Sequence, residues 1–241
     1  MDIKATARAN MQSLRSNEYP GRGIVIGQTP NGERLVQVYW IMGRSENSRN
    51  RVFVRDGDLV RTAPFDESKV EDPSLIIYNC IRKLQHTHIV SNGDQTDTIH
   101  EGLRNSRSFE ESLYTRTFEP DAPNYTPRIA GVIDLNDSTH AYKLAILKTL
   151  DGVETRPARH IFNFGNFIPG IGHYIATYDG NGDPLPSFSG EPRALPLGDD
   201  IDEVLTTYWQ ALDPDNKVSM LVKFIDPDSN ESDIRIANKN K

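Results

Sequence analysis

The sequence predicts an α+β fold, in which helices are segregated from the strands and cover the faces of sheets. Short stretches of strand character recur along the 241 residues and are separated by turn clusters such as Asp179-Gly180-Asn181-Gly182. The hydrophobic period changes to helical spacing in only two regions, between about residues 95 and 118 and from residue 201 onward. No internal repeat, linker or low-complexity block interrupts this order. We therefore expect one domain over residues 1–241, with residues 1–20 as a lead-in segment.

The first half of the chain is expected to be rich in strands. Residues 23–27 and 34–42 form a predicted β-hairpin, because the Thr29-Pro30-Asn31-Gly32 segment between them has turn chemistry. A second pair is expected around Asp56-Gly57, whereas residues 75–82 form an apolar run that fits either a strand or a helix. The other expected strands cover residues 51–55, 58–62, 87–90, 128–135, 141–149, 173–178, 218–225 and 233–237.

Helices are expected in two places, with a weaker signal at the N-terminus. Ser108 and Glu111 have the spacing of a capping box, within a pair of consecutive helices between about residues 95 and 118. The clearest helix follows Asp199 and Asp200, whose charges favour a helix N-terminus. The first twenty residues are weakly helical, at most a short helix ending before Pro20. The apolar positions of the clearest helix are Ile201, Val204, Leu205, Tyr208, Trp209 and Leu212.

Composition and charge exclude several classes of protein. The formal net charge of -7 argues against a general nucleic-acid binder, although it allows a local basic pocket for a phosphorylated small molecule. No segment approaches the roughly 18 apolar residues of a membrane-spanning helix, and the N-terminus lacks the apolar region of a secretory signal. The single cysteine, Cys80, excludes an internal disulfide framework and fits a reducing compartment. We therefore expect a cytoplasmic protein without a membrane partner.

Common catalytic patterns are absent from the sequence. His86 and His88 would share one face of a strand, but no further ligand completes a zinc site, so no metal is predicted. Cys80 lies in an apolar run and is expected to be a small buried residue rather than a reactive thiolate. The sequence contains no Gly-x-Ser-x-Gly elbow, no Gly-x-Gly-x-x-Gly fingerprint and no phosphate-binding P-loop.

Three polar strings remain as candidates for a ligand site. GRSENSRNR places Arg44, Arg49 and Arg51 close together, either as an anion cradle or as a solvated basic loop. In VSNGDQTDTI, Gly93 permits a positive φ or a close backbone approach, and Thr96 or Asp97 could cap a following helix. That helix N-terminus would either face a bound anion or belong to a plain strand–turn–helix junction. The third string, EPDAPNYTPRIAG, suits a polar pocket or an exposed surface equally well.

Together with YNCIR (residues 78–82), these strings resemble the archaeal-type IMP cyclohydrolase family. The matching segments are GRSENSRNR, YNCIR, VSNGDQTDTI and TPRIA (residues 126–130), and they occur in the same order within residues 21–131. The resemblance implies the four-layer αββα sandwich of N-terminal-nucleophile hydrolases. Because the chain begins with Met1 and not with Ser, Thr or Cys, the fold is expected to operate without the N-terminal nucleophile.

The implied reaction is the last step of de novo purine synthesis. The enzyme would close the ring of 5-formamidoimidazole-4-carboxamide ribonucleotide, with loss of water, to give inosine monophosphate. This makes it a hydrolase of cyclic amidine carbon–nitrogen bonds that operates in the ring-closing direction. The reaction needs no cofactor, metal or covalent intermediate, and the expected partner is a small purine ribonucleotide. Whether the protein assembles into a homo-oligomer is not decided by the sequence.

The resemblance also implies roles for individual residues. Arg51 would stabilise charge, Tyr78 would form a hydrogen bond with the formyl oxygen, and Glu119 would transfer a proton or orient the amide. Which arginine holds the phosphate stays open. Contacts with the base, ribose or phosphate are expected from Ser45, Arg49, Asn79, Arg82, Ser91, Asn92, Gly93, Thr96, Asp97 and Arg128.

Two other functions fit the same residues. The chain could be a purine-nucleotide-binding protein without catalysis, against which the intact Arg51, Tyr78 and Glu119 argue. It could also be an amide or formamide hydrolase of the same fold, against which the missing N-terminal nucleophile argues.

Overall fold

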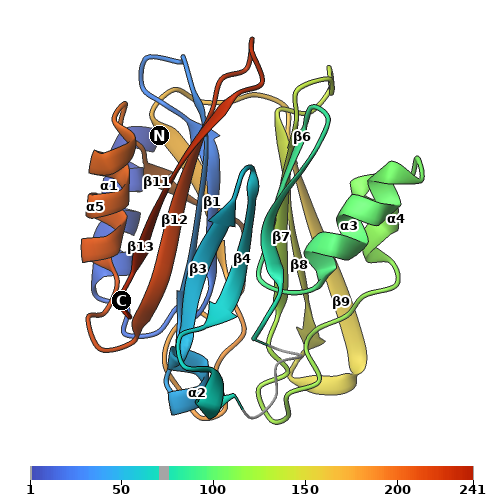
Figure 1. Cartoon of the computed structure of the whole chain (residues 1–241), viewed down its shortest axis with the longest axis vertical. Helices are drawn as coiled ribbons and strands as arrows, with labels where there is room; N and C mark the ends of the chain where they lie inside the picture. Colours follow the sequence, from blue (N-terminus) through green and yellow to red (C-terminus); the bar gives the residue numbers. More distant parts are fainter. Residues whose placement is uncertain (1, 71–75, 241) are drawn as a thin grey trace.

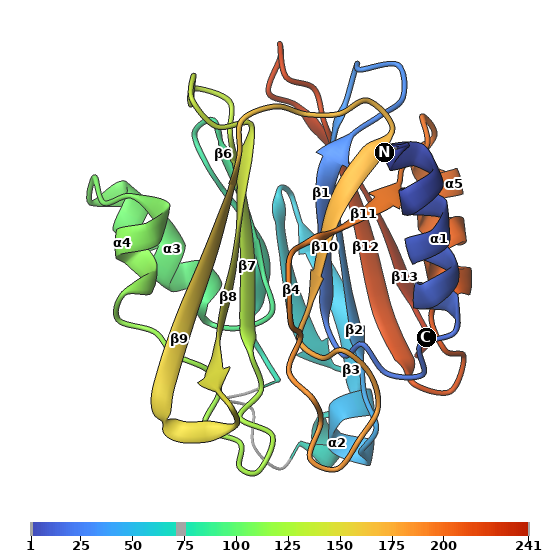
Figure 2. The same ribbon diagram turned by 180° about the vertical axis from the view of Figure 1, so that it is seen from behind.

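The computed structural model describes residues 2–70 and 76–240 of the chain. Two antiparallel sheets pack face to face, and helices cover the outer face of each, so the layers run helix, sheet, sheet, helix (Figure 1). Helices α1 (Ile3–Arg15) and α5 (Ile201–Ala211) cover one sheet, whereas α3 (Gln95–Arg104) and α4 (Phe109–Leu113) cover the other (Figure 2). The α+β class predicted from the sequence is confirmed, since two antiparallel sheets are covered by a few separate helices.

The first sheet has six strands in the order β11-β10-β1-β2-β12-β13. The predicted hairpin is confirmed as β1 (Gly23–Gln28) and β2 (Leu35–Met42), and its turn is closed by a 2.9 Å bond from the Thr29 amide to the Arg34 carbonyl. Three more strands match predicted segments, but β11 is not predicted, because its few residues lie among prolines and glycines. The remaining strands are β10 (Ile171–Ala176), β11 (Arg193–Pro196), β12 (Lys217–Ile225) and β13 (Ser232–Asn238).

The second sheet is a meander of seven strands in sequence order from β3 to β9. The undecided run 75–82 enters β5 (Asn79–Leu84), so its strand alternative is correct; residue 75 lies outside the described residues. The prediction missed the longest strand, β9 (Val153–Phe164), because this edge strand is largely exposed and lacks the alternation that burial on one face produces. The other strands are β3 (Arg51–Asp56), β4 (Leu59–Pro64), β6 (Thr87–Ser91), β7 (Arg128–Asp134) and β8 (Tyr142–Leu150).

Helices α4 and α5 begin at the capping residues that the sequence indicates. Ser108 and Glu111 form the predicted reciprocal capping box of α4, and the Asp200 carboxylate caps α5. The helix at the N-terminus is longer than expected. Asp2 caps α1, which buries Ala7, Met11 and Leu14. Its apolar stripe is narrow within a polar segment, which explains the weak sequence signal.

Two short helical turns complete the chain, α2 (Glu46–Arg49) and a 3₁₀ turn (Glu67–Lys69). The main core fills the space between the two sheets and extends under α1 and α5. Its largest fully buried side chain, Trp40, packs against Tyr208 of α5. Polar contacts also cross this core, and in one of them the Gln37 side-chain amide donates to the His88 carbonyl at 3.2 Å. No helix in the described part of the chain is long and apolar enough to cross a membrane.

Candidate active site

Most of the predicted site residues lie at one end of the sandwich, the end that carries α2 (Figure 1), whereas Arg82 lies farther along β5. Arg51 and Arg128 are the first residues of β3 and β7, Ser91 is the last residue of β6, and Tyr78 directly precedes β5. Because neighbouring strands of this sheet are antiparallel, the starts of β3, β5 and β7 meet the end of β6 at the same edge. Four motifs that are far apart in the sequence therefore meet at the same end of the sheet, where these strands begin or finish.

Arg51 lies in the interior between the sheets and is fully buried. Its Nε donates to the Ser48 carbonyl at 2.8 Å and its Nη2 to the Met42 carbonyl at 3.5 Å. Its Nη1 is also buried and has no hydrogen-bond partner within residues 2–70 and 76–240. Burial and the neighbouring charge of Arg22 lower the pKa of Arg51. The side chain thus presents an unused donor to the space between the sheets.

Tyr78 is 6% exposed and is fixed at both ends. Its amide donates to the Thr62 hydroxyl at 2.9 Å, and its own hydroxyl lies 2.8 Å from that of Tyr39. Burial raises the pKa of Tyr78, although the charges of Arg51 and Arg22 act against the rise. At neutral pH Tyr78 is therefore a neutral phenol that can donate a hydrogen bond.

Glu119 is 2% exposed and lies on the segment between α4 and β7. Its amide donates to the Thr126 carbonyl at 2.9 Å, which closes the loop and turns the side chain inward. Its carboxylate forms no hydrogen bond or ion pair with any residue that the structure describes. Burial raises its pKa from 4.5 to about 7, while the charges of Arg22, Arg128 and Arg51 hold it down. A carboxyl with this pKa can both accept and release a proton near neutral pH.

Arg51, Tyr78 and Glu119 form a buried cluster, and two residues that the sequence prediction missed complete it. Arg22 directly precedes β1. Burial lowers its pKa, but Glu119 and the neighbouring tyrosines together raise the pKa by more, so that it lies above its ordinary value. Tyr39 of β2 is fully buried and contacts Tyr78. The Gly-Arg-Gly sequence before a strand and a tyrosine inside an apolar run were the available signals. Neither identifies a site, because both patterns are common in structural positions.

The turn between β6 and α3 is held by side-chain hydrogen bonds to the backbone. Asn92 accepts from the Ile129 amide at 2.8 Å and donates to the Pro127 carbonyl at 3.0 Å, which fixes the turn against β7. The hydroxyls of Ser91 and Thr96 bond to each other. The turn therefore brings Ser91, Asn92 and Thr96 together, with all three side chains buried.

The structure decides between the two alternatives for Gly93 and corrects the expected cap of the following helix. Gly93 does not have a positive φ; its backbone approaches closely instead, since an added Cβ would lie 2.6 Å from the Gln95 Oε1 and 2.8 Å from an Arg128 nitrogen. The N-cap of α3 is Asp94, without a side-chain cap bond, so neither Thr96 nor Asp97 caps the helix. Both lie inside the first turn, because the helix begins directly after Asp94.

The remaining candidates of this region pair with one another. The Asp97 carboxylate accepts from Asn79 at 3.0 Å and from Arg82 at 2.8 Å. Arg128 donates to Asp94 at 2.6 Å and to the Gln95 side chain at 2.8 Å. These pairs connect the first turn of α3 to β5 and β7, and they leave Asp97 partly exposed.

The three arginines of GRSENSRNR bind three different parts of the chain. Arg44 donates to Asn181 at 2.8 Å, and Arg49 donates to the Gly43 carbonyl at 2.9 Å and to Asn216 at 3.1 Å. Arg51 instead turns into the core. Ser45 is exposed and caps α2. Arg51 is thus buried, whereas Arg44 and Arg49 are exposed, so the three arginines do not form the single anion-binding group that the sequence suggested.

The histidine pair and Cys80 lie outside this cluster. His88 is buried with its Nε2 2.9 Å from Asn230, but His86 lies in the turn before β6, so the two do not share a strand face as expected. Cys80 is a buried free thiol whose pKa is raised by burial, in agreement with the prediction of a small buried residue.

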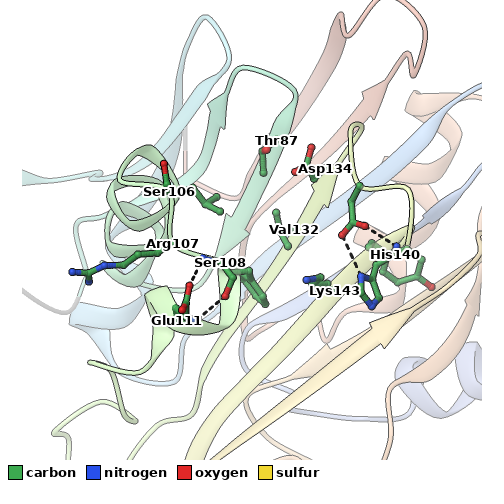
Figure 3. Close-up of a pocket in the computed structure, with 13 residues that line it drawn as sticks. Thr87, Ser106, Arg107, Ser108, Glu111, Val132, Asp134, His140 and Lys143 are labelled. Atoms are coloured by element: carbon green, nitrogen blue, oxygen red, sulfur yellow. Dashed lines mark hydrogen bonds and ion pairs between the residues drawn. The ribbon is translucent and has the colours of Figure 1, made fainter.

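A cavity of about 460 Å³ lies elsewhere, between the α3–α4 pair and the outer face of the second sheet (Figure 3). Its lining contains none of the predicted site residues. Its polar side chains pair locally, as Glu111 does with Ser108 and His140 with Asp137 (Figure 3).

The chain is similar to proteins of one family over most of its length. The profile of the family described as "IMP cyclohydrolase-like protein" matches residues 19–230. A protein from Methanococcus aeolicus named IMP cyclohydrolase is 30% identical over 165 residues, which cover 67% of this chain and 74% of the relative. Two further proteins with the same name come from Methanosphaera stadtmanae and Methanocella arvoryzae. The first is 30% identical over 68% of this chain and 75% of its own length, and the second is 37% identical over 56% and 65%.

The matched range includes all four motifs and every residue of the buried cluster. The resemblance predicted from those motifs is confirmed, and the chain belongs to the archaeal-type IMP cyclohydrolase family.

Proposed function

We propose that this chain closes the purine ring, converting 5-formamidoimidazole-4-carboxamide ribonucleotide to inosine monophosphate and water. Membership of a family whose relatives are named IMP cyclohydrolase supports this activity. The observation that carries the proposal is the buried Glu119, whose pKa of about 7 comes with nearby positive charge from Arg22 and Arg51. A dehydrative cyclisation needs a group that takes up one proton and returns it.

Each step of the reaction can be assigned to one of these groups. The carboxamide nitrogen attacks the formyl carbon, a carbon–nitrogen bond forms, and negative charge develops on the formyl oxygen. Tyr78 donates a hydrogen bond to that oxygen, and the Arg51 guanidinium stabilises the charge. Glu119 accepts the proton from the attacking nitrogen and returns it to the oxygen. The formamido nitrogen gives up the second proton and forms a carbon–nitrogen double bond as the carbon–oxygen bond breaks, so the oxygen leaves as water.

Positioning is expected to supply much of the rate, because both reacting groups belong to one molecule. The ribonucleotide would contact the β6–α3 turn through Ser91, Asn92, Gly93 and Thr96. The paired side chains of Asn79, Arg82, Asp97 and Arg128 form the adjoining edge, and Ser45 and Arg49 lie on the α2 side of the same end.

We also propose that the fold is that of N-terminal-nucleophile hydrolases, within one domain over residues 1–241. The helix–sheet–sheet–helix order supports this assignment (Figure 1). The use of a single cysteine in the whole chain fits a reducing compartment and supports a cytoplasmic location. Assembly into a homo-oligomer is left to measurement of the mass in solution.

The direct test is to incubate the purified protein with the formamido substrate and to follow inosine monophosphate by absorbance. Glu119→Gln should lower turnover by about 100-fold or more, as expected for loss of a general base, and should leave nucleotide affinity nearly unchanged. Glu101→Gln is the matched control, because Glu101 is exposed on α3. Tight nucleotide binding without any turnover would instead identify a non-catalytic nucleotide-binding protein. Full activity of Glu119→Gln would remove Glu119 from the mechanism.

A further inference from the structure

Tyr39 and Tyr78 form a direct hydrogen bond between the two sheets. Tyr39 lies in β2 of the six-stranded sheet, and Tyr78 precedes β5 of the seven-stranded sheet. Their hydroxyl oxygens are 2.8 Å apart and both side chains are buried. The Tyr39 ring also stacks on Phe53 of β3, with ring centroids 5.5 Å apart. Tyr39 is therefore fixed by the opposite sheet at both its ring and its hydroxyl.

Either hydroxyl could donate by geometry, and the exposure of the two side chains favours one direction. Tyr39 is fully buried, and its hydroxyl has no acceptor other than Tyr78 among the residues that the structure describes. If Tyr78 donated to Tyr39, the proton of Tyr39 would be buried without an acceptor, which costs free energy. Tyr78 is 6% exposed and Tyr39 is 0% exposed, so only the proton of Tyr78 can reach a bound molecule. The arrangement that leaves no proton without a partner is therefore the one in which Tyr39 donates and the oxygen of Tyr78 accepts. The proton of Tyr78 remains free for another acceptor.

We propose that Tyr39 is a positioning residue for catalysis, which holds the hydroxyl of Tyr78 so that its proton is directed at the formyl oxygen of the substrate. This inference rests on the proposed function, since it concerns the hydrogen bond that Tyr78 donates in ring closure. Tyr39 itself contacts neither the reacting atoms nor, by this inference, the nucleotide.

The accepted bond also strengthens the bond that Tyr78 donates. A hydroxyl that accepts a hydrogen bond is polarised and becomes a better donor, and this effect is larger in a buried site. The charged groups that face the pair, Arg51 and Arg22, act in the same direction by favouring negative charge on the Tyr78 oxygen. The neighbouring thiol of Cys80 is engaged elsewhere, with the Val60 carbonyl at 3.3 Å.

The test is a pair of phenylalanine substitutions measured singly and together. Tyr39→Phe removes one hydroxyl and keeps the ring that packs on Phe53. It should lower kcat by about 10-fold, the effect of one neutral hydrogen bond, and leave KM within about 2-fold. Tyr78→Phe should lower kcat further. The double variant should be no slower than Tyr78→Phe alone, because Tyr39 acts only through Tyr78.

Tyr208→Phe is the matched control, since it removes a buried hydroxyl that donates to the Pro196 carbonyl at 2.9 Å, away from the site. An unchanged kcat for Tyr39→Phe would overturn the proposal. So would a 10-fold loss that persists in the Tyr78→Phe background, because Tyr39 would then act by another route.

A second measurement separates this inference from the proposed function. In protein labelled with carbon-13 at the tyrosine Cζ, the chemical shift of Tyr78 should change on Tyr39→Phe and should stay the same on Tyr208→Phe. A wild-type protein without turnover would contradict the proposed function, and the chemical shift would still decide on the hydrogen bond. An unchanged Tyr78 resonance would refute the positioning role.

Discussion

The guanidinium of Arg128 lies 2.6 Å from the carboxylate of Asp94, and this pair joins the first residue of β7 to the residue before α3. Arg128 is nearly buried, whereas Asp94 is partly exposed and also binds Arg116 at 2.8 Å. The second bond of Arg128 goes to the Gln95 side chain. The arginine therefore holds the β6–α3 turn in place as well as being a candidate for nucleotide contact.

Arg128→Met should lower the free energy of unfolding by about 2 kcal/mol, because it removes charged hydrogen bonds at a nearly buried position. It should also raise KM, since the turn and a candidate ligand are lost together. Urea unfolding followed by circular dichroism measures the first effect. Arg44→Met is the control, an exposed arginine at the same end of the molecule. Equal unfolding midpoints for the two variants would show that the Asp94 pair does not hold the turn.

Catalysis should fall on the acid side of neutrality. Glu119 acts as a base only when ionised, and its pKa of about 7 places that limit near pH 7. We expect kcat/KM to decrease about 10-fold for each pH unit well below this value. A pH profile that stays flat between pH 5 and 8 would show that ionisation of Glu119 does not limit the reaction.

The same carboxyl should make the folded protein less stable as the pH rises. Because its pKa is higher in the folded than in the unfolded chain, the folded state binds more protons between pH 4.5 and about 7, and the free energy of unfolding falls across this window. Above it, the buried charge costs up to about 3 kcal/mol. Glu119→Gln should therefore stabilise the protein at pH 8 and change little at pH 4. Differential scanning calorimetry at both values tests this, and equal gains would contradict it.

Gly93→Ala should destabilise the turn through crowding and not through backbone strain. The added methyl group would meet the Gln95 and Arg128 side chains, which are bonded to each other and cannot both move away freely. We expect a loss of about 1–2 kcal/mol, typical of overpacking, together with a raised KM. Gly165→Ala is the control, since nothing lies within 4 Å of its added Cβ. Equal stability of the two variants would show that the site adapts.

Leu14→Ala tests whether α1 is part of the folded unit. Leu14 is buried and belongs to the main hydrophobic core, so its truncation should cost about 2–4 kcal/mol. Gln12→Ala on the exposed face of the same helix should cost close to nothing. If Leu14→Ala leaves the unfolding midpoint unchanged, residues 1–20 form only a lead-in segment.

Most strands and the α5 helix were predictable because burial on one or both faces left an apolar pattern in the sequence. The β1–β2 hairpin and the α5 helix show this, with turn chemistry in one and a regular apolar stripe in the other. β9 lacks such a pattern because solvent reaches most of its side chains. The polar surroundings of Met11 and Leu14 masked the apolar stripe of α1 in the same way.

Arg51, Tyr78 and Glu119 were predicted as site residues because the motifs they belong to resemble a family. The residue patterns alone did not decide whether each of these strings lines a ligand pocket or lies on the exposed surface. Arg22 and Tyr39 could not be predicted, because their position depends on how the two sheets face each other. Local spacing carries no information on that long-range pairing.

The cluster is assembled from both sheets, with Arg22 and Tyr39 from one and Arg51 and Tyr78 from the other. A small sliding of one sheet over the other would therefore alter every distance between the two halves of the site at once. Substitutions at distant contacts between the sheets, such as Gln37 with His88, would then change turnover while every site residue stays intact. Variation in the core of this protein is constrained by its chemistry as much as by its stability.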